Sequence, residues 1–360
     1  MPEFSDTVTL SAMKTTDNQK INRGRFLKSA GSVGVAGLAW SSGLRAGSAS
    51  QFGASSTAEE VTAGLDLRGQ HILVTGANSG LGYESVRVLG LRGATVFVAA
   101  RNQNKAEQTV QRLRKAAPGV TQELVPVVCE LTDFDSIIAC AEVVRRTGGQ
   151  LDALICNAGI MAIPELEIVR GLEKQFVVNY LGHFLLAGAL APELARAPGG
   201  RLVTLASGLI DKAPESGIDF DNLDGSRGYD PMQAYGRSKL AMAIMAMNFS
   251  RRFAGDAGSA NTLRPGVIQT ELFRDLPWYM RAGMFVTGWA WTKSVAEGAA
   301  TQCFVATHPA VKNVSGKFFA DCQVIDPENV HVFDAALGER LWDASLDQLG
   351  EHRKAIRSVS

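Results

Sequence analysis

The sequence carries no net charge and no long block of like charge. Its 360 residues include 36 Lys and Arg and 36 Asp and Glu, so the formal charge at neutral pH is zero. Nucleic-acid-binding domains usually present a basic patch or stripe. The charge balance therefore gives no reason to expect a nucleic acid as partner, and a small molecule or a protein is the better expectation.

Cysteine is sparse, and no internal repeat is visible. The cysteines show neither a Cys-x-x-Cys pair nor the spacing of metal ligands. They are Cys129, Cys140, Cys156, Cys303 and Cys322. Because Cys129 and Cys156 lie in apolar, strand-like runs, we interpret the set as buried thiols. The sequence predicts neither a disulfide framework nor a metal site.

Residues 1–60 are rich in Ser, Gly, Ala and Thr and lack the periodicity of packed elements. Within them, the basic stretch 23–28 precedes a mildly apolar run at 29–40 and small residues at 46–50. That order describes a signal peptide, and the apolar run is too short to span a bilayer. A disordered extension of a cytosolic protein is the alternative, and translation beginning at Met13 would give a more ordinary signal length.

From Gln70 onward, short apolar runs alternate with longer helical patterns. This alternation predicts one α/β domain over residues 65–350, a Rossmann-type doubly wound parallel sheet with helices on both faces. The expected strands are 71–75, 94–100, 123–129, 151–156 and 200–206, with weaker ones at 261–263 and 317–320. The first expected helix ends near residue 92. The others span 133–147, 171–197, 231–253, 295–307 and 335–346.

A glycine-rich turn follows the first expected strand directly and opens the first helix. Glycines let a backbone approach a ligand closely, and a helix N-terminus offers unpaired N–H groups to a pyrophosphate. The residues predicted to contact a dinucleotide here are Gly76, Asn78, Ser79, Gly80, Leu81 and Gly82. A simple tight turn is the alternative.

Arg101 stands at the end of the second expected strand, where dinucleotide folds place the group that reads the ribose 2′ position. An acidic residue there would bond a free hydroxyl, whereas a cation suits a 2′-phosphate. Arg101, with Asn102 and Lys105 near it, therefore favours NADP over NAD.

Other candidate residues follow later strands. The small residues Asn157, Ala158 and Gly159 leave room for a flat cofactor, and Ser207 follows the fifth strand. Ligands of open α/β sheets bind outside the carboxyl ends of the strands, so these residues should share one edge with the glycine-rich turn. Asn179, flanked by apolar residues in a helical pattern, is expected to point inward.

Tyr235 and Lys239 are four apart in an expected helix and so share one face. An ammonium beside a phenol favours the phenolate, which makes Tyr235 a candidate acid/base. Alone, this pair is as easily a solvated helix face, and the convergence of the other strand-end residues raises its significance.

The segment 264–270 is expected to close over the cofactor, and 272–292 is unusually rich in aromatic residues. The aromatic cluster could be core, but its place after the closing segment favours an apolar substrate lid.

These motifs together resemble the short-chain dehydrogenase/reductase family over residues 66–348. The stretches 175–186, 220–223, 265–272 and 341–342 resemble its retinol dehydrogenase and protochlorophyllide reductase branch, which generally prefers NADP and apolar carbonyls or alcohols. Glu130 stands where the family usually has Asp. The resemblance implies further cofactor contacts at Glu130, Leu131, Pro265, Gly266, Val267 and Thr270.

The resemblance implies a role for each candidate catalytic residue. Tyr235 would exchange a proton with the substrate oxygen, Ser207 would hydrogen-bond that oxygen, and Lys239 would lower the phenol's pKa and hold the nicotinamide ribose. Asn179 would fix a water that connects Lys239 to solvent. The expected activity is NADP-dependent interconversion of an alcohol and a carbonyl on an apolar substrate, in a chain that could form a homo-oligomer.

Two other functions stay open at this point. One is a cofactor-binding sensor without turnover, and the other is a lyase or epimerase that uses hydride transfer transiently. The complete set of Ser207, Tyr235 and Lys239 argues against a pure sensor.

The N-terminal stretch 23–28 resembles the core of a twin-arginine export signal, with Gly24 in place of the second arginine. Export of the folded protein would carry a cofactor along. We therefore expect a periplasmic protein whose mature chain begins near Gln51, with a cytoplasmic protein as the alternative.

Overall fold

The protein is represented by a computed structural model that describes residues 50–120, 122–253, 258–268 and 292–357. Eight strands form one sheet in the order β10-β9-β8-β7-β4-β1-β2-β3, and every neighbouring pair is parallel except β9 and β10. The strands are β1 (His71–Thr75), β2 (Thr95–Ala100), β3 (Leu124–Val128), β4 (Ala153–Cys156), β7 (Arg201–Leu205), β8 (Ser259–Arg264), β9 (Phe318–Ala320) and β10 (Gln323–Ile325).

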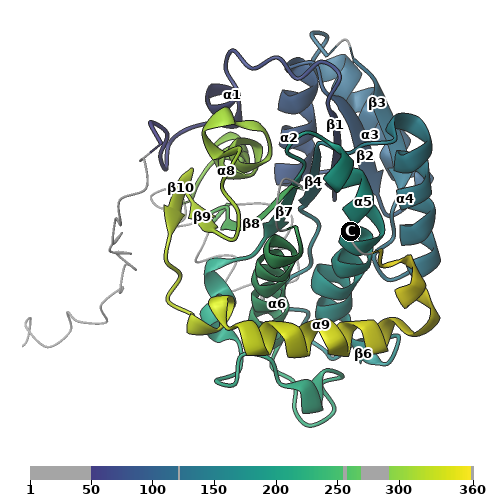
Figure 1. Ribbon diagram of the computed structural model, residues 1–360, viewed down its shortest axis with the longest axis vertical. Helices are drawn as coiled ribbons and strands as arrows, with labels where there is room; N and C mark the ends of the chain where they lie inside the picture. The colour runs from purple at the N-terminus through teal and green to yellow at the C-terminus, as the bar shows by residue number, and fades with distance from the viewer. Residues whose placement is uncertain (1–49, 121, 254–257, 269–291, 358–360) are drawn as a thin grey trace, which may run out of the picture. The chain divides into compact units, whose positions relative to one another are not determined.

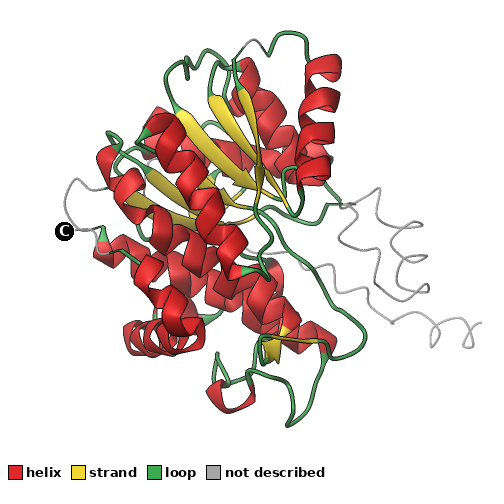
Figure 2. Ribbon diagram, turned by 90° about the vertical axis from the view of Figure 1, so that its right-hand side faces the viewer, coloured by secondary structure: helices red, strands yellow, loops and turns green. Residues whose placement is uncertain are grey.

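Helices cover both faces of this sheet (Figures 1 and 2). The long ones are α2 (Gly80–Leu91), α3 (Gln103–Ala116), α4 (Phe134–Gly148), α5 (Gly182–Arg196), α6 (Pro231–Arg252), α8 (Val295–Thr307) and α9 (Ala335–Leu349). One apolar core joins the sheet to α2, α3 and α8, and a second joins it to α4, α5 and α6, with α9 packed on α6. The predicted doubly wound single domain is confirmed.

The expected start of the 171–197 helix is wrong by several residues. Instead of a helix, residues 168–173 form a hairpin of β5 (Ile168–Val169) and β6 (Leu172–Glu173). Its turn residues Arg170 and Gly171 have φ of 54° and 79°, the left-handed values that a tight hairpin turn requires. A π-helical turn, η1 (Phe176–Leu181), then leads into α5. The antiparallel edge strand β10 was not predicted.

The described part of the N-terminal segment packs on the domain. Phe52 makes edge-on contacts with the rings of Phe304 and His308, 5.9 and 5.6 Å between centroids. The Gln323 side chain donates to the carbonyls of Ser50 and Phe52. The short helix α1 (Ala58–Val61) has a capping box and packs against α8. Residues 50–61 are therefore packed on the α/β domain.

One helical stretch, Lys174–Arg196, is long and apolar enough to cross a membrane by length and composition. Within the described structure, 89% of its apolar window is buried, as expected for a core helix of an α/β domain. Its apolar character is accounted for by contacts with the sheet, α4 and α6.

Candidate active site

A cavity of about 520 Å³ lies at the carboxyl ends of the parallel strands. The sequence predicted that a ligand would bind at this edge of the sheet. The predicted residues that line it are Gly76, Asn78, Ser79, Gly80, Leu81, Arg101, Glu130, Leu131, Asn157, Ala158, Gly159, Tyr235, Lys239 and Pro265. Lys105, Thr132, Ile160, Met161, Lys174 and Val178 also line it. Of these, the sequence reasoning had only Lys105.

The remaining predicted cofactor residues lie elsewhere. Gly82 packs behind the glycine-rich turn, because a Cβ there would be 2.4 Å from the carbonyl oxygen of Gly76. Gly266, at φ 89°, lies against the Lys293 side chain, and Val267 is 41% exposed. Thr270 and residues 272–291 of the aromatic segment lie outside the described residues.

The glycine-rich turn leaves the start of α2 open towards the cavity. Gly76 and Gly80 have φ of 64° and 54°, so both need the freedom of glycine. Ser79 is the N-cap residue but makes no side-chain cap bond, which leaves N–H groups of the first turn for a ligand. Arg112 on α3 donates to the Asn78 carbonyl at 2.5 Å and ties the turn to its neighbour.

Two cations lie after β2, Arg101 next to its last residue and Lys105 in the first turn of α3. Arg101 is exposed and Lys105 is half-buried, and both line the cavity. Neither forms an ion pair with another described residue. Asn102 holds this region by accepting the Lys105 N–H as the cap of α3, at 3.0 Å. At this end of the cavity the two positive charges therefore have no ion-pair partner among the residues that the structure describes.

Glu130, after β3, has its carboxylate held locally. Its Oε1 accepts hydrogen bonds from both the N–H and the hydroxyl of Thr132, at 3.1 and 3.0 Å. Glu130 also lines the cavity. The longer carboxylate at this position is thus fixed rather than freely rotating.

Asn179 is fully buried, which confirms its inward position. Its Oδ1 accepts the N–H of Ile160 at 2.8 Å, and its Nδ2 donates to the Ile160 carbonyl and to the Ser238 hydroxyl, both at 2.9 Å. It lies in the π-helical turn, a feature often found at functional sites. One side chain therefore connects the loop after β4 to α6.

Tyr235 and Lys239 are buried on one face of α6, and both line the cavity. The Lys239 Nζ lies 5.9 Å from the centroid of the Tyr235 ring and donates to the Leu205 carbonyl at 2.8 Å. Burial raises the pKa of Tyr235 to about 12, and its hydrogen bond with Ser207 partly offsets this rise. Burial lowers the pKa of Lys239 to about 8.

This balance corrects one expectation from the sequence. An ammonium four residues away was expected to favour the phenolate, but in the folded protein desolvation raises the pKa of Tyr235 and keeps its phenol protonated at neutral pH. Such a group holds a proton at neutral pH and can donate it to a substrate oxygen that gains negative charge.

Ser207 lies two residues beyond the end of β7 and caps η2 (Gly208–Lys212), accepting the Leu209 N–H at 3.1 Å. Its side chain also hydrogen-bonds the Tyr235 hydroxyl, and no described histidine or carboxylate bonds it. Around Tyr235, an apolar cluster contains Met161, Ala162, Leu209 and Met232. The phenol of Tyr235 therefore lies between a serine hydroxyl and an apolar surface.

Behind Tyr235 lies a polar network that the sequence reasoning missed. Gln175 accepts the Ala162 N–H at 2.7 Å and donates to the Tyr229 hydroxyl at 3.2 Å, while Tyr229 donates to the Ile163 carbonyl at 2.6 Å. These bonds hold Ala162 at a positive φ of 49°. Gln175 lies in the stretch 175–186 that carried the family resemblance, and this was the only signal for it.

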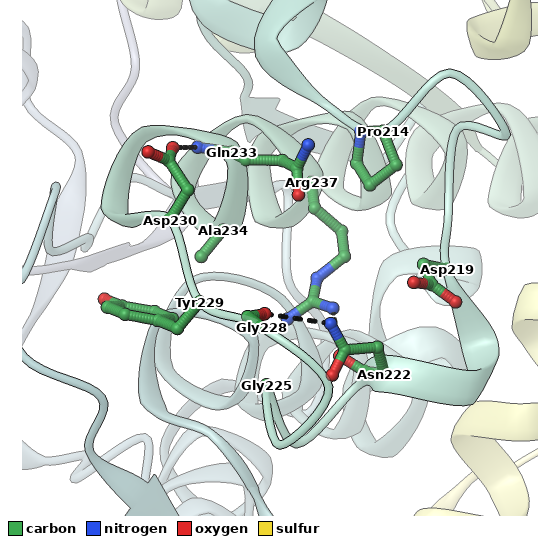
Figure 3. Close-up of a pocket in the computed structure, with 10 residues that line it drawn as sticks. All are labelled: Pro214, Asp219, Asn222, Gly225, Gly228, Tyr229, Asp230, Gln233, Ala234 and Arg237. Atoms are coloured by element: carbon green, nitrogen blue, oxygen red, sulfur yellow. Dashed lines mark hydrogen bonds between the residues drawn. The ribbon is translucent and has the colours of Figure 1, made fainter.

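Arg237, two residues after Tyr235, is linked to this network through Glu173, whose carboxylate accepts the Gln175 N–H at 2.8 Å. Figure 3 shows the Arg237 side chain among the residues that line a small pocket. Its guanidinium lines a small polar pocket with Asn222 and Tyr229, and it donates to the Asn222 carbonyl at 2.5 Å. The buried Glu173 carboxylate is 3.7 Å from its Nη2. The pocket volume, about 10 Å³, is no larger than one water needs, so this pocket supports the site and is not a ligand site.

No group of three or more His, Cys, Asp or Glu side chains within the described ranges is placed to hold a metal ion. All five cysteines are free and buried, as interpreted from the sequence.

Comparison with known proteins defines the class. A family model described as short chain dehydrogenase matches residues 70–219. The chain is also 36% identical over 304 residues to a Brassica napus protein called short-chain dehydrogenase TIC 32 A, chloroplastic, covering 82% of this chain and 94% of that one. The chain therefore belongs to the short-chain dehydrogenase/reductase family, whose members bind a nicotinamide cofactor and act as oxidoreductases.

Two further relatives agree with this assignment. Human retinol dehydrogenase 14 is 34% identical over 299 residues, covering 79% of this chain and 87% of its own. A crystal structure of an uncharacterized protein from Mycobacterium paratuberculosis is similar with a TM-score of 0.62 and 27% identity, covering 80% of this chain and 96% of that one. The resemblance drawn from the sequence is confirmed at the level of the family.

Proposed function

We propose that this protein is an NADP-dependent oxidoreductase that interconverts an alcohol and a carbonyl on an apolar small molecule. The observation that carries the proposal is the single cavity in which an open helix N-terminus, two cations and the pair Tyr235 and Lys239 meet. Each of these features suits one part of a hydride-transfer site, and one cavity joins them all.

The residues present fit a dinucleotide. The uncapped start of α2 suits a pyrophosphate, and Glu130 is fixed where an acceptor could bond the adenine. A Cβ on Gly159 would lie 3.3 Å from Asn179 Oδ1 and 3.4 Å from Lys239 Nζ, so only glycine keeps that space open. When bound, the nicotinamide would supply or accept the hydride.

The choice of NADP rests on Arg101 and Lys105. A 2′-phosphate would add negative charge at the end of β2, where both cations lack a carboxylate partner among the described residues. NAD would offer them only a hydroxyl. Electrostatics therefore favours the phosphorylated cofactor.

The chain's own side chains would handle the proton. Tyr235 holds a proton at neutral pH and would transfer it to the substrate oxygen, while Ser207 would hydrogen-bond the same oxygen. The charged form of Lys239, below pH about 8, would stabilise the developing phenolate and bond the nicotinamide ribose. Asn179 would complete a relay to solvent through a water.

The apolar substrate class follows from the side chains beside Tyr235. Met161, Leu209 and Met232 form the described part of that surface, and they offer dispersion and desolvation rather than hydrogen bonds. A long apolar chain or ring system beside the reacting carbonyl would cover them.

The test is a screen of retinoid, steroid, aromatic and aliphatic carbonyls with NADPH, followed as loss of reduced-cofactor absorbance. Turnover of apolar carbonyls with NADPH in preference to NADH is the expected result. Tight NADPH binding without turnover of any class would instead support the sensor, and conversion without net loss of NADPH would support a lyase or epimerase.

We further propose that residues 1–50 direct export and that the mature chain begins near Gln51 in the periplasm of a bacterium. The order of basic, apolar and small residues in the sequence supports this. Residence of the intact chain in the cytoplasm is the alternative.

A further inference from the structure

His183, in the first turn of α5, is fully buried and has partners at both ring nitrogens. Its Nδ1 lies 2.8 Å from the main-chain oxygen of Asn179, and its Nε2 lies 2.9 Å from the hydroxyl of Thr75. We propose that His183 is a positioning residue, held in the neutral Nδ1–H form, that joins Asn179 to the cofactor-facing turn at Asn157 through Thr75. The inference rests on the proposed function, because that function makes this turn part of the cofactor site.

The tautomer follows from the partners. A carbonyl oxygen can only accept, so the ring nitrogen beside Asn179 must carry the hydrogen. The Thr75 hydroxyl accepts the N–H groups of Asn157 and Ala158 at 2.9 and 3.0 Å, which uses both of its lone pairs. Its single hydrogen is left to donate, and the Nε2 of His183 at 2.9 Å is nearer than the Ile155 carbonyl at 3.4 Å.

The hydrogen bonds therefore run in one direction. They pass from the N–H groups of Asn157 and Ala158 to Thr75, from Thr75 to His183, and from His183 to the Asn179 carbonyl. Every donor and acceptor along the way is satisfied, which is the condition for a buried polar network to fix one geometry. No other neutral or charged form of the imidazole satisfies all of these partners.

The surroundings keep the imidazole neutral. Burial lowers the pKa of His183 to about 4, the bond to Asn179 opposes this change, and the charge of Lys239 lowers the pKa further. A proton on Nε2 would also place two donors against each other at Thr75. The network is thus stable throughout the neutral range.

The two ends of this series of hydrogen bonds, Asn157 and Asn179, both lie near the proposed catalytic side chains. Asn179 binds Ile160 and Ser238 through its side chain, and Asn157 donates to the Thr75 carbonyl at 2.8 Å. Gly159 lies between them, next to both Asn179 Oδ1 and Lys239 Nζ. A shift of His183 would therefore displace the cavity lining at Gly159, beside Lys239, in addition to disturbing the core around His183.

The simpler reading is a satisfied core histidine that contributes only to stability. A neighbour provides the control for it, because Phe184 is equally buried on the same helix but packs against the Trp342 ring, 4.8 Å between centroids. Substitution of Phe184 should disturb α5 without touching the network.

The experiment compares His183→Phe, Thr75→Val, the double variant and Phe184→Leu in the full-length protein. NADPH affinity is measured by isothermal titration, together with kcat, KM and the thermal midpoint. His183→Phe keeps an aromatic ring at this position but loses both hydrogen bonds. It should therefore weaken NADPH binding about tenfold and lower kcat. Thr75→Val should weaken NADPH binding at least as much. The double variant should bind NADPH no more than about twofold more weakly than Thr75→Val does. Phe184→Leu should lower only the midpoint.

Two results would overturn the role of His183. One is wild-type NADPH affinity and kcat in His183→Phe with a lowered midpoint, and the other is full multiplication of the two single effects in the double variant. Should His183→Phe not fold, His183→Leu lacks the same bonds and carries the same expectations. Failure of wild-type protein to bind NADPH would refute the proposed function instead.

Discussion

The side-chain amide of Asn179 donates to the hydroxyl of Ser238 at 2.9 Å. Ser238 lies between Tyr235 and Lys239 on α6, and its hydroxyl in turn donates to the Tyr235 carbonyl at 2.7 Å. Because Asn179 also binds both polar groups of the Ile160 main chain, its side chain fixes the loop after β4 relative to α6, which carries Tyr235 and Lys239.

Asn179→Ala should therefore lower the free energy of unfolding by more than its small change in side-chain volume suggests. It removes three buried bonds and leaves both Ile160 groups without their partner, so we expect a loss of about 3 kcal/mol in the free energy of unfolding and a clear fall in kcat. Ser238→Ala, the matched control, loses one of the three Asn179 bonds and should cost about 1 kcal/mol. Urea unfolding of both variants makes the test, and equal small losses would contradict this role for Asn179.

The sequence predicted the arrangement of the site better than its energetics. Strand ends marked by Arg101, Asn157 and Ser207 were expected on one edge because parallel strands share their carboxyl ends, and the sheet order confirms that edge. The π-helical turn and the two-residue strands of the hairpin give no period long enough to recognise.

The residues that hold the site in place could not be predicted, for a different reason. Gln175, Tyr229 and His183 act through partners distant in sequence, and a single sequence does not show such contacts. The pKa of Tyr235 depends on burial against local charge, and burial is known only once the chain is folded.

Arg101→Asp should reverse the cofactor preference. The new carboxylate would repel a 2′-phosphate and accept a bond from a free ribose hydroxyl, so the ratio of kcat/KM with NADPH to that with NADH should fall at least tenfold, an estimate of about 1.4 kcal/mol for one close charge contact. Arg114→Asp makes the same charge change on the exposed side of α3 and should leave the ratio unchanged. A similar fall in both variants would show a general charge effect instead.

Lys239 should make the stability of the apoprotein depend on pH. Its ordinary pKa of 10.5 applies to the unfolded chain, whereas burial lowers the folded value to about 8. Between these values the unfolded chain binds more protons at this lysine, so the Lys239 contribution to the free energy of unfolding should rise with pH from about 8. Buried thiols with raised pKa, such as those of Cys303 and Cys322, act in the opposite direction above their ordinary value of 9.0. Tyr235, with its pKa raised from 10.0 to about 12, acts in the opposite direction above pH 10.

Urea unfolding at several pH values between 7 and 10 measures this contribution. The difference in the free energy of unfolding between the wild-type protein and Lys239→Met should change in favour of the wild type as pH rises above about 8. The difference between the wild-type protein and Lys115→Met, which removes an exposed lysine of α3, should not change with pH. Parallel curves for wild type and Lys239→Met would mean that the ammonium is not desolvated.

Export can be tested at Gly24, which replaces the second arginine of the signal that the segment resembles. Gly24→Arg should increase the fraction of protein in the periplasm, and mass spectrometry of the exported form should find a new N-terminus near Gln51. Gly31→Arg adds the same charge outside the basic stretch and should not increase export. An intact residue 1 or 13 on protein confined to the cytosol would refute the signal.

The central claim is that Tyr235 exchanges the proton with the substrate oxygen in an NADP-dependent reaction. The most direct measurement is kcat and NADPH affinity of Tyr235→Phe on a carbonyl that the wild-type protein reduces. Only the phenolic hydroxyl is lost, so the fold and NADPH affinity should persist while kcat falls by about a hundred- to ten-thousand-fold. Turnover close to that of the wild type in the purified variant would contradict the account.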